Sequence, residues 1–131
     1  MKERSNSKTK LFAGIDTVIL RVKDLELSRE WYEKNLGLKA VFEDENIKLV
    51  VFNTGSPTSL TIWQWENEEP NHPSKNFSSF PIFRSMNAKR DHAFLSSQGV
   101  KVEDVVEEKG IKYFTFYDFD GNKLEACEII E

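Results

Sequence analysis

The sequence predicts an α+β protein in which two β-α-β-β-β modules form a curved sheet trough with helices outside. Three observations predict this class: strand-like alternation of apolar residues, two helical segments that each end at a glycine, and a repeated order of elements. The repeat also shows in the spacing, because residues 37–39 correspond to residues 99–101, and Leu60 corresponds to Leu124. With 131 residues, of which 39% are apolar, the chain is long enough for one compact domain built from two such halves.

The first module is expected over residues 14–65, after a disordered polar tail at residues 1–13. Its first strand is expected to show strict alternation, and its helix should place Trp31 and Tyr32 on one side and stop at Gly37. The predicted elements are a strand at 15–22, a helix at 24–36 and strands at 39–43, 47–53 and 59–65.

The second module is expected over residues 79–131, after a charged connector at 66–78 that contains Pro70 and Pro73. A turn at residues 120–122 should direct the chain into the last strand. The predicted elements are a strand at 80–85, a helix at 87–98 and strands at 101–105, 112–117 and 123–129.

Alternation along the strands assigns each side chain to one of two faces. One set is apolar and belongs under the helices: Val18, Leu20, Leu60, Ile62 and Leu124. The opposite set lines the trough: Thr17, Ile19, Arg21, Thr61, Trp63, Trp65, Phe80, Ile82, Arg84, Tyr113, Thr115, Tyr117 and Glu125.

Charge and cysteine content exclude several functional classes. The first ten residues carry a net charge of +3 and the remainder −7, and such an acidic body argues against a nucleic-acid groove. Those ten residues lack the apolar segment of a secretory signal, and no stretch is apolar enough to cross a membrane. The single cysteine, Cys127, cannot form an internal disulfide, so we expect a cytoplasmic protein.

Three motifs stand out: V-K-D-L-E-L-S-R-E-W-Y-E-K-N-L-G-L (22–38), the Q-G-V (98–100) that ends the second helix, and D-F-D-G-N-K-L-E (118–125). Together they make residues 14–130 resemble the vicinal oxygen chelate superfamily, the group of glyoxalase I, fosfomycin- and bleomycin-resistance proteins and extradiol dioxygenases. The resemblance implies paired β-α-β-β-β modules and, commonly, a divalent metal held by His or Glu side chains at four inward strand positions.

Those four positions fall on Thr17, Thr61, Phe80 (or Ser79 if the register slips) and Glu125, so one family ligand is present. Because threonine hydroxyls and a phenyl ring replace imidazole or carboxylate donors poorly, the sequence predicts no metal cofactor. We expect His72 to be an exposed connector residue, unless it reaches a partner's site.

Other chemical signals are weak. We expect His92 to pack on its helix and Cys127 to be a small buried residue, and no nucleophile–histidine arrangement or glycine-rich phosphate loop is present.

The remaining trough residues indicate a ligand class. Trp63, Trp65 and Tyr113 offer flat surfaces for a planar group, or else fill the trough or a subunit contact. Arg21 and Arg84 each require an anion, either Glu125 or an acidic ligand. At least one hydroxyl of Tyr113, Thr115 and Tyr117 should reach a polar group.

Three functions follow. The first is a metal-independent small-molecule-binding protein, similar to bleomycin-resistance proteins, that sequesters or senses a small, acidic and partly aromatic ligand. The second is a lyase, isomerase or dioxygenase with an unusual metal site or with Glu125 as general acid or base. The third is an interaction module with a filled trough. A homodimer is expected, because edge strands need cover and the superfamily often closes its groove with a second subunit.

Overall fold

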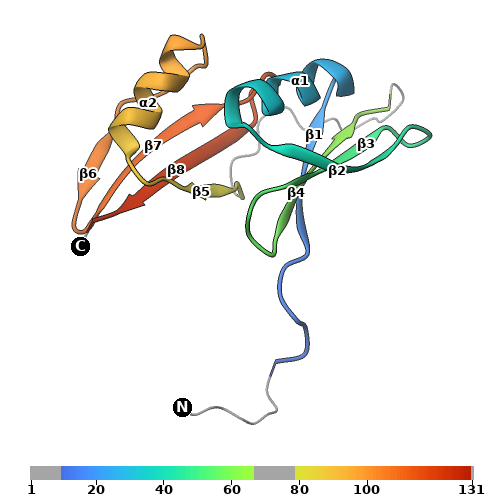
Figure 1. Ribbon diagram of the computed structural model, residues 1–131, viewed down its shortest axis with the longest axis horizontal. Helices are drawn as coiled ribbons and strands as arrows, with labels where there is room; N and C mark the ends of the chain where they lie inside the picture. The colour runs from blue at the N-terminus through green and yellow to red at the C-terminus, as the bar shows by residue number, and fades with distance from the viewer. Residues whose placement is uncertain (1–9, 67–78, 131) are drawn as a thin grey trace.

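The structure, a computed structural model, describes residues 10–66 and 79–130 (Figure 1). The first module contains β1 (Thr17–Val22), α1 (Leu25–Leu36), β2 (Lys39–Asp44), β3 (Leu49–Asn53) and β4 (Ser59–Gln64). The second module contains β5 (Ile82–Arg84), α2 (Ala88–Ser97), β6 (Val106–Glu108), β7 (Ile111–Tyr117) and β8 (Lys123–Ile129). Most of the predicted tail and connector lies outside the described residues.

Each module forms its own four-stranded mixed sheet with the same connectivity. The strand orders are β1-β4-β3-β2 and β5-β8-β7-β6, and in each sheet the first strand lies parallel to the last. The remaining neighbours are antiparallel. The α+β class and the repeat of two β-α-β-β-β modules are therefore confirmed, as two sheets that do not close on each other.

Each of the two helices is preceded by a residue whose side chain caps its N-terminus. Asp24 precedes α1 and its side chain accepts a hydrogen bond from Leu27 N, while Asn87 precedes α2 and accepts one from Arg90 N. Helix α1 stops at Gly37, whose backbone is left-handed with φ at 68°. In the described part of the chain, no helix is long and apolar enough to cross a membrane.

The core lies between the helices and the sheet faces that they cover. Its buried side chains come from both modules and include Val50, Phe52, Leu60, Ile62, Phe114, Phe116 and Leu124, all at most 2% exposed. Val18 and Leu20 pack against this cluster at its border. The face predicted to lie under the helices is thus the face that packs there.

Two predicted strands of the second module differ from those observed. The strand predicted at 101–105 is an isolated bridge, Val102 to Phe116, followed by β6 with Val106 opposite Tyr113. The pairing register shifts by one residue between these two points, so the extended ladder is interrupted. The strand predicted at 80–85 shortens to β5, because Pro81 has no N–H to donate to a ladder.

A polar network joins helix α1 to the turn between β7 and β8. Tyr32, fully buried, donates a hydrogen bond of 2.6 Å from its hydroxyl to Asp118 Oδ2, and Ser28 Oγ donates one of 3.0 Å to Asp120 Oδ2. Asn122 Nδ2 donates to the carbonyl of Arg21 at 3.0 Å. Burial raises the pKa of Asp118, although hydrogen bonds from Tyr32 and Asn122 act in the opposite direction. The turn motif therefore holds the two modules together.

Candidate functional site

The two first-module positions at which the resemblance implies metal ligands lie in contact. Thr17 on β1 and Thr61 on β4 place their hydroxyl oxygens 2.8 Å apart, and Thr17 Oγ1 donates to the carbonyl of Ser59 at 3.2 Å. Thr61 is 2% exposed, so its hydroxyl has little access to solvent. These hydroxyls satisfy each other and the backbone.

The second module repeats this geometry with different side chains. Ile19 lies opposite Thr61 in the first sheet, and Ile82 lies opposite Glu125 in the second. Thr17 lies two residues before Ile19, and Phe80 lies two residues before Ile82. Thr17 and Phe80 are therefore equivalent positions of the two modules. This register supports Phe80, rather than Ser79, as the third position. Phe80 itself precedes β5, and the ammonium of Lys123 lies 4.0 Å from the centre of its ring.

The four positions do not fit a divalent metal. Two are threonines bonded to each other, and the third is a phenyl ring next to a cation, which leaves Glu125 as a single strong donor. Within residues 10–66 and 79–130, no three His, Cys, Asp or Glu side chains gather into a group that could hold an ion.

Arg21 does not pair with Glu125. Its guanidinium lies 4.3 Å from the ring centres of both Trp63 and Trp65, and it donates to the carbonyls of Trp63 at 3.1 Å and Gln64 at 3.2 Å. Each of the two tryptophans thus packs one face of its ring against Arg21, a side chain of the same module. Trp63 also donates its indole N–H to the carbonyl of Ile47 at 3.0 Å.

Glu125 is half-buried on β8, with Thr115 opposite it on β7. Among the described residues, its carboxylate has no hydrogen-bond or ion-pair partner. Tyr113 lies one pair further along, opposite Cys127, and Tyr117 lies opposite Lys123. The Tyr117 hydroxyl donates to Glu103, so the expectation that one of these hydroxyls reaches a polar group is met by Tyr117.

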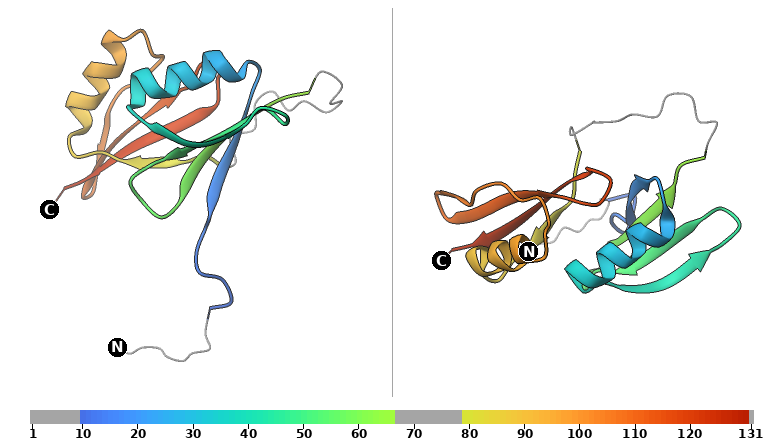
Figure 2. Two further views of the ribbon diagram at one scale, coloured as in Figure 1. Left: turned by 45° about the vertical axis from the view of Figure 1, so that its right-hand side comes forward. Right: turned by 90° about the horizontal axis from the view of Figure 1, so that it is seen from above.

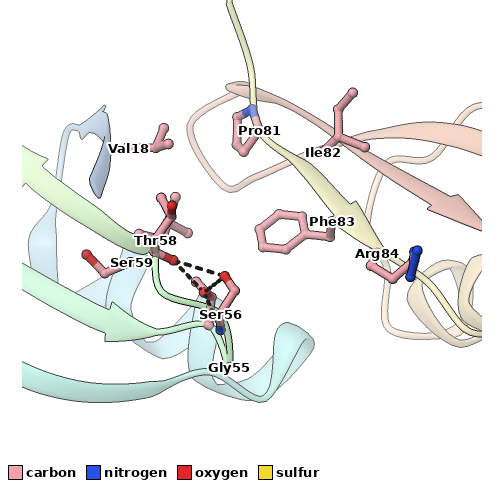
Figure 3. A pocket seen from close by; sticks show the side chains of 11 residues that line it. Val18, Gly55, Ser56, Thr58, Ser59, Pro81, Ile82, Phe83 and Arg84 are labelled. Atoms are coloured by element: carbon pink, nitrogen blue, oxygen red, sulfur yellow. Dashed lines mark hydrogen bonds between the residues drawn. The ribbon is translucent and has the colours of Figure 1, made fainter. Parts of the chain in front are cut away.

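Arg84 holds the position in the second module that Arg21 holds in the first. It is exposed and makes no hydrogen bond or ion pair with another residue of the described ranges. It lines a cavity of about 470 Å³ between β5 and the loop that joins β3 to β4 (Figure 3). Thr58 and Ser56 form the facing wall, and Trp63 and Glu125 are not among the lining residues.

The hydroxyl-rich loop at residues 54–59 was missed by reasoning from strand alternation. Its hydroxyls bond to one another and to the backbone: Thr54 Oγ1 lies 2.8 Å from Ser56 Oγ and donates to the carbonyl of Thr58 at 2.6 Å. The signal in the sequence is the run T-G-S-P-T-S, in which four of six side chains carry hydroxyls. Alternation assigns faces only within strands, so it gave no place to a loop.

His92 and Cys127 are not brought into a catalytic arrangement. The His92 ring packs edge-on against Phe114 at 5.2 Å, with Nε2 3.0 Å from the carbonyl of Glu103. Cys127 is half-buried, and His72 lies outside the described residues.

Comparison with known proteins gives one family and one fold. Residues 14–126 match the family described as the Glyoxalase/Bleomycin resistance protein/Dioxygenase superfamily. No curated protein matches the chain.

Solved structures with the same fold include a protein described as antibiotic-binding, one described as a lyase and one described as a fosfomycin resistance protein. TnmS3, an antibiotic binding protein from a Streptomyces species, is 20% identical over 92% of this chain and 98% of its own, with a TM-score of 0.76. A lactoylglutathione lyase from Agrobacterium tumefaciens is 19% identical over 91% and 96%, with a TM-score of 0.71. The fosfomycin resistance protein FosX from Listeria monocytogenes is 16% identical over 90% and 94%, with a TM-score of 0.74.

Proposed function

Because the chain belongs to the Glyoxalase/Bleomycin resistance protein/Dioxygenase superfamily, we propose that it is a metal-independent small-molecule-binding protein of that superfamily. It sequesters or senses a small ligand that is acidic and partly aromatic. The observation that carries this proposal is the pair of hydroxyls, Thr17 and Thr61, bonded to each other at 2.8 Å where the superfamily commonly places metal ligands.

The ligand class rests on one cation and on flat aromatic surfaces. Arg84 is exposed, and a guanidinium without a partner among the described residues suits a carboxylate or phosphate. Trp63, Trp65 and Tyr113 are half-buried, and their flat rings suit a planar group. Arg21 stacks on the tryptophans, so its role is to hold those rings in place rather than to bind the anion. The antibiotic-binding neighbour TnmS3 supports binding without chemistry as a role for this fold.

The proposal includes a homodimer in the reducing cytoplasm. Among the described strands, β1 and β5 each have one edge that pairs with no other strand, and Ile19 and Ile82 on them are 46% and 56% exposed. A second copy covering this side would bury both isoleucines. Cys127, unpaired in the chain, suits a reducing compartment.

A second candidate function is catalysis by Glu125. Its half-buried carboxylate lacks a partner among the described residues, so it is able to exchange a proton with a bound substrate. The lactoylglutathione lyase neighbour shares the fold with this chain. The two candidate functions predict different metal contents of the purified protein and different effects of the substitution Glu125→Gln.

Metal content separates the two candidates. Purified protein after dialysis should contain well under one equivalent of Zn, Ni, Mn, Fe or Co by elemental analysis, and these ions should leave its melting temperature unchanged. The reason is the donor set, which offers one carboxylate. A stoichiometric metal that is lost in Glu125→Gln contradicts the proposal and favours the enzyme.

Ligand class is tested by tryptophan fluorescence during titration with acidic, neutral and cationic aromatic compounds. Acidic compounds should quench, and Arg84→Ala should weaken their binding about tenfold or more, since a charge-assisted contact contributes about 1.5–3 kcal/mol. Arg90→Ala is the matched control, because Arg90 is exposed and pairs with Asp91. Quenching by neutral or cationic compounds alone, or equal binding by Arg84→Ala, shows that the ligand is not recognised as an anion.

A further inference from the structure

The chain just before β1 carries large apolar side chains that lie in solvent. Leu11, Phe12 and Ile15 are 86%, 74% and 70% exposed. Residues 10–14, named the strap from here on, form neither helix nor strand. Figure 1 and the left view of Figure 2 show this blue segment running away from both modules. Three such side chains within five residues leave much apolar surface in water, and its burial elsewhere would be favourable.

The strap leaves the fold beside the cavity of about 470 Å³ that lies between β5 and the β3–β4 loop. The two residues that follow it are bonded to the wall of that cavity. Thr58 Oγ1 donates to the carbonyl of Ile15 at 2.7 Å, and Ser59 N donates to that of Asp16 at 2.9 Å. Thr58 and Ser59 both line the cavity. Phe12 lies three residues before Ile15, so an extended chain carries it up to about 10 Å from this anchor. The cavity is therefore within reach of the strap.

Gly14 gives the strap a hinge next to its anchor. Its φ is 151°, in a region that residues with a side chain rarely adopt. Apart from its chain neighbours, no atom lies within 4 Å of the position that a Cβ would take, so the surroundings leave this residue free to rotate. Phe12 can therefore turn from solvent toward the cavity while Ile15 and Asp16 stay bonded.

The cavity offers apolar surface from both modules. Val18 and Leu60 line it from the first module, and Pro81, Ile82 and Phe83 line it from the second (Figure 3). Ile82 is 56% exposed, so a group that enters the cavity also covers apolar surface of β5. The volume exceeds that of a phenylalanine and a leucine side chain together.

The polar groups of the lining do not require a polar occupant. Each of its four hydroxyls donates to a backbone carbonyl at 2.6–3.3 Å: those of Thr54, Ser56, Thr58 and Ser59. An apolar occupant therefore leaves none of them unsatisfied. Arg84 is the one charged residue of the lining, and it is exposed, so its guanidinium can remain in water.

We propose that the strap folds back at Gly14 and places Leu11 and Phe12 in this cavity, so that the chain itself supplies the occupant. Apolar surface of the strap and of the lining then leaves water together, which favours closure. The occupant is the same chain rather than a second copy, because so short a link gives an effective concentration on the order of millimolar. A ligand that binds Arg84 has to displace the strap, a consequence that rests on the proposed function.

Methyl NMR of the full-length chain, with ¹³C-labelled isoleucine, leucine and valine methyls, tests closure without any ligand. Nuclear Overhauser contacts should join an aromatic ring to the methyls of Val18 and Ile82, and they should disappear in Phe12→Ser. The same substitution should shift the methyl signals of Val18, Leu60 and Ile82, because a ring current is removed. Phe119→Ser is the matched control and should leave these signals in place, because Phe119 is 56% exposed and does not line the cavity.

The proposal is overturned if Phe12→Ser leaves the three methyl signals unmoved or if the contacts are absent. A sample that mixes labelled and unlabelled chains identifies the occupant, and contacts between copies overturn the proposal in favour of straps exchanged between two chains. Because Phe12 is mostly exposed, its replacement is not expected to unfold the chain.

Binding provides a second readout. Acidic aromatic compounds should bind Phe12→Ser at least about twofold tighter than the unaltered chain, since a strap closed half of the time halves the competent population. Equal affinities overturn displacement of the strap by the ligand. If no acidic compound binds either chain, the proposed ligand class is wrong, and the methyl signals still decide whether the strap closes.

Discussion

The residue with the most consequential single contact is Tyr32, at the centre of the α1 face that the sequence already placed inward. Its hydroxyl donates to Asp118 at 2.6 Å across 86 residues of sequence. The spacing of apolar residues along the helix predicts that such a tyrosine is buried, because the spacing shows which face of the helix points to the core. It does not identify the carboxylate, since the two residues meet only when the modules pack together.

Replacing Tyr32 by phenylalanine should lower the free energy of unfolding by about 1–3 kcal/mol, because a buried carboxylate loses a charge-assisted donor. Urea denaturation followed by circular dichroism measures this change. Tyr117→Phe is the matched control: its hydroxyl bonds to Glu103 at an exposed position, so the loss should be below about 1 kcal/mol. Equal effects of the two substitutions would show that the Tyr32 contact is not buried in solution.

The Tyr32→Phe loss should also depend on pH. Burial raises the pKa of Asp118 above that of an unfolded aspartate, so the folded chain keeps this proton to higher pH. The contribution of this group to the free energy of unfolding therefore decreases as pH rises through that raised pKa. The Tyr32 hydroxyl favours the ionised carboxylate, so its removal should raise the pKa further and destabilise the chain more at neutral pH than at about pH 4. A loss that is constant with pH would contradict this coupling.

At the candidate site, alternation predicted on which face of the sheet a side chain lies, but not which other side chains it contacts. Alternation placed Thr17 and Thr61 on one face, and their hydroxyls meet there. It also placed Arg21 with Trp63, but the partner expected for the guanidinium was Glu125 or an acidic ligand, and its contact with the two tryptophan rings was not foreseen. The stack arises from β1 lying parallel to β4, which puts Arg21 directly opposite Trp63. Strand pairing of this kind is not visible in a local pattern.

Among the elements, all but one were predicted to within about two residues, and the exception is the strand expected at 101–105. The last strand has the bounds predicted, Lys123–Ile129, and its buried Leu124 and Ala126 alternate with the half-buried Glu125 and Cys127. The segment at 101–105 failed because its pairing shifts by one residue before β6 begins. Such a shift depends on the partner strand, so the segment alone does not encode it.

The end of α1 provides a test at this scale. Gly37 adopts φ of 68° and donates its N–H to the carbonyl of Glu33 at 3.1 Å. Gly37→Ala should lower the free energy of unfolding by about 1–2 kcal/mol, because a side chain is disfavoured in left-handed backbone. Lys34→Ala, at an exposed position of the same helix, should change it by less than about 0.5 kcal/mol. Thermal unfolding of both variants measures the difference, and an unchanged Gly37→Ala variant would mean that the helix ends differently.

The whole molecule is two similar sheets made into one unit by contacts that repeat analysis does not foresee. The buried cluster draws side chains from both modules, and Asp118, Asp120 and Asn122 bond to residues of the first module. A repeat in the sequence predicts two similar halves, but it gives no information on how they dock. The docking also creates the cavity that Arg84 lines, and a pattern within one module does not predict such a cavity.

If docking makes the modules one cooperative unit, both should unfold in a single transition. All three tryptophans, Trp31, Trp63 and Trp65, lie in the first module, so their fluorescence reports that half alone. The amide signals of Phe116 and Leu124 report the core of the second half. At one protein concentration, the urea midpoints from the two probes should coincide. Ser28→Ala should lower both midpoints together, because it removes a hydrogen bond between the modules. Separate midpoints, with the first module melting alone, would show that each sheet is stable without the other.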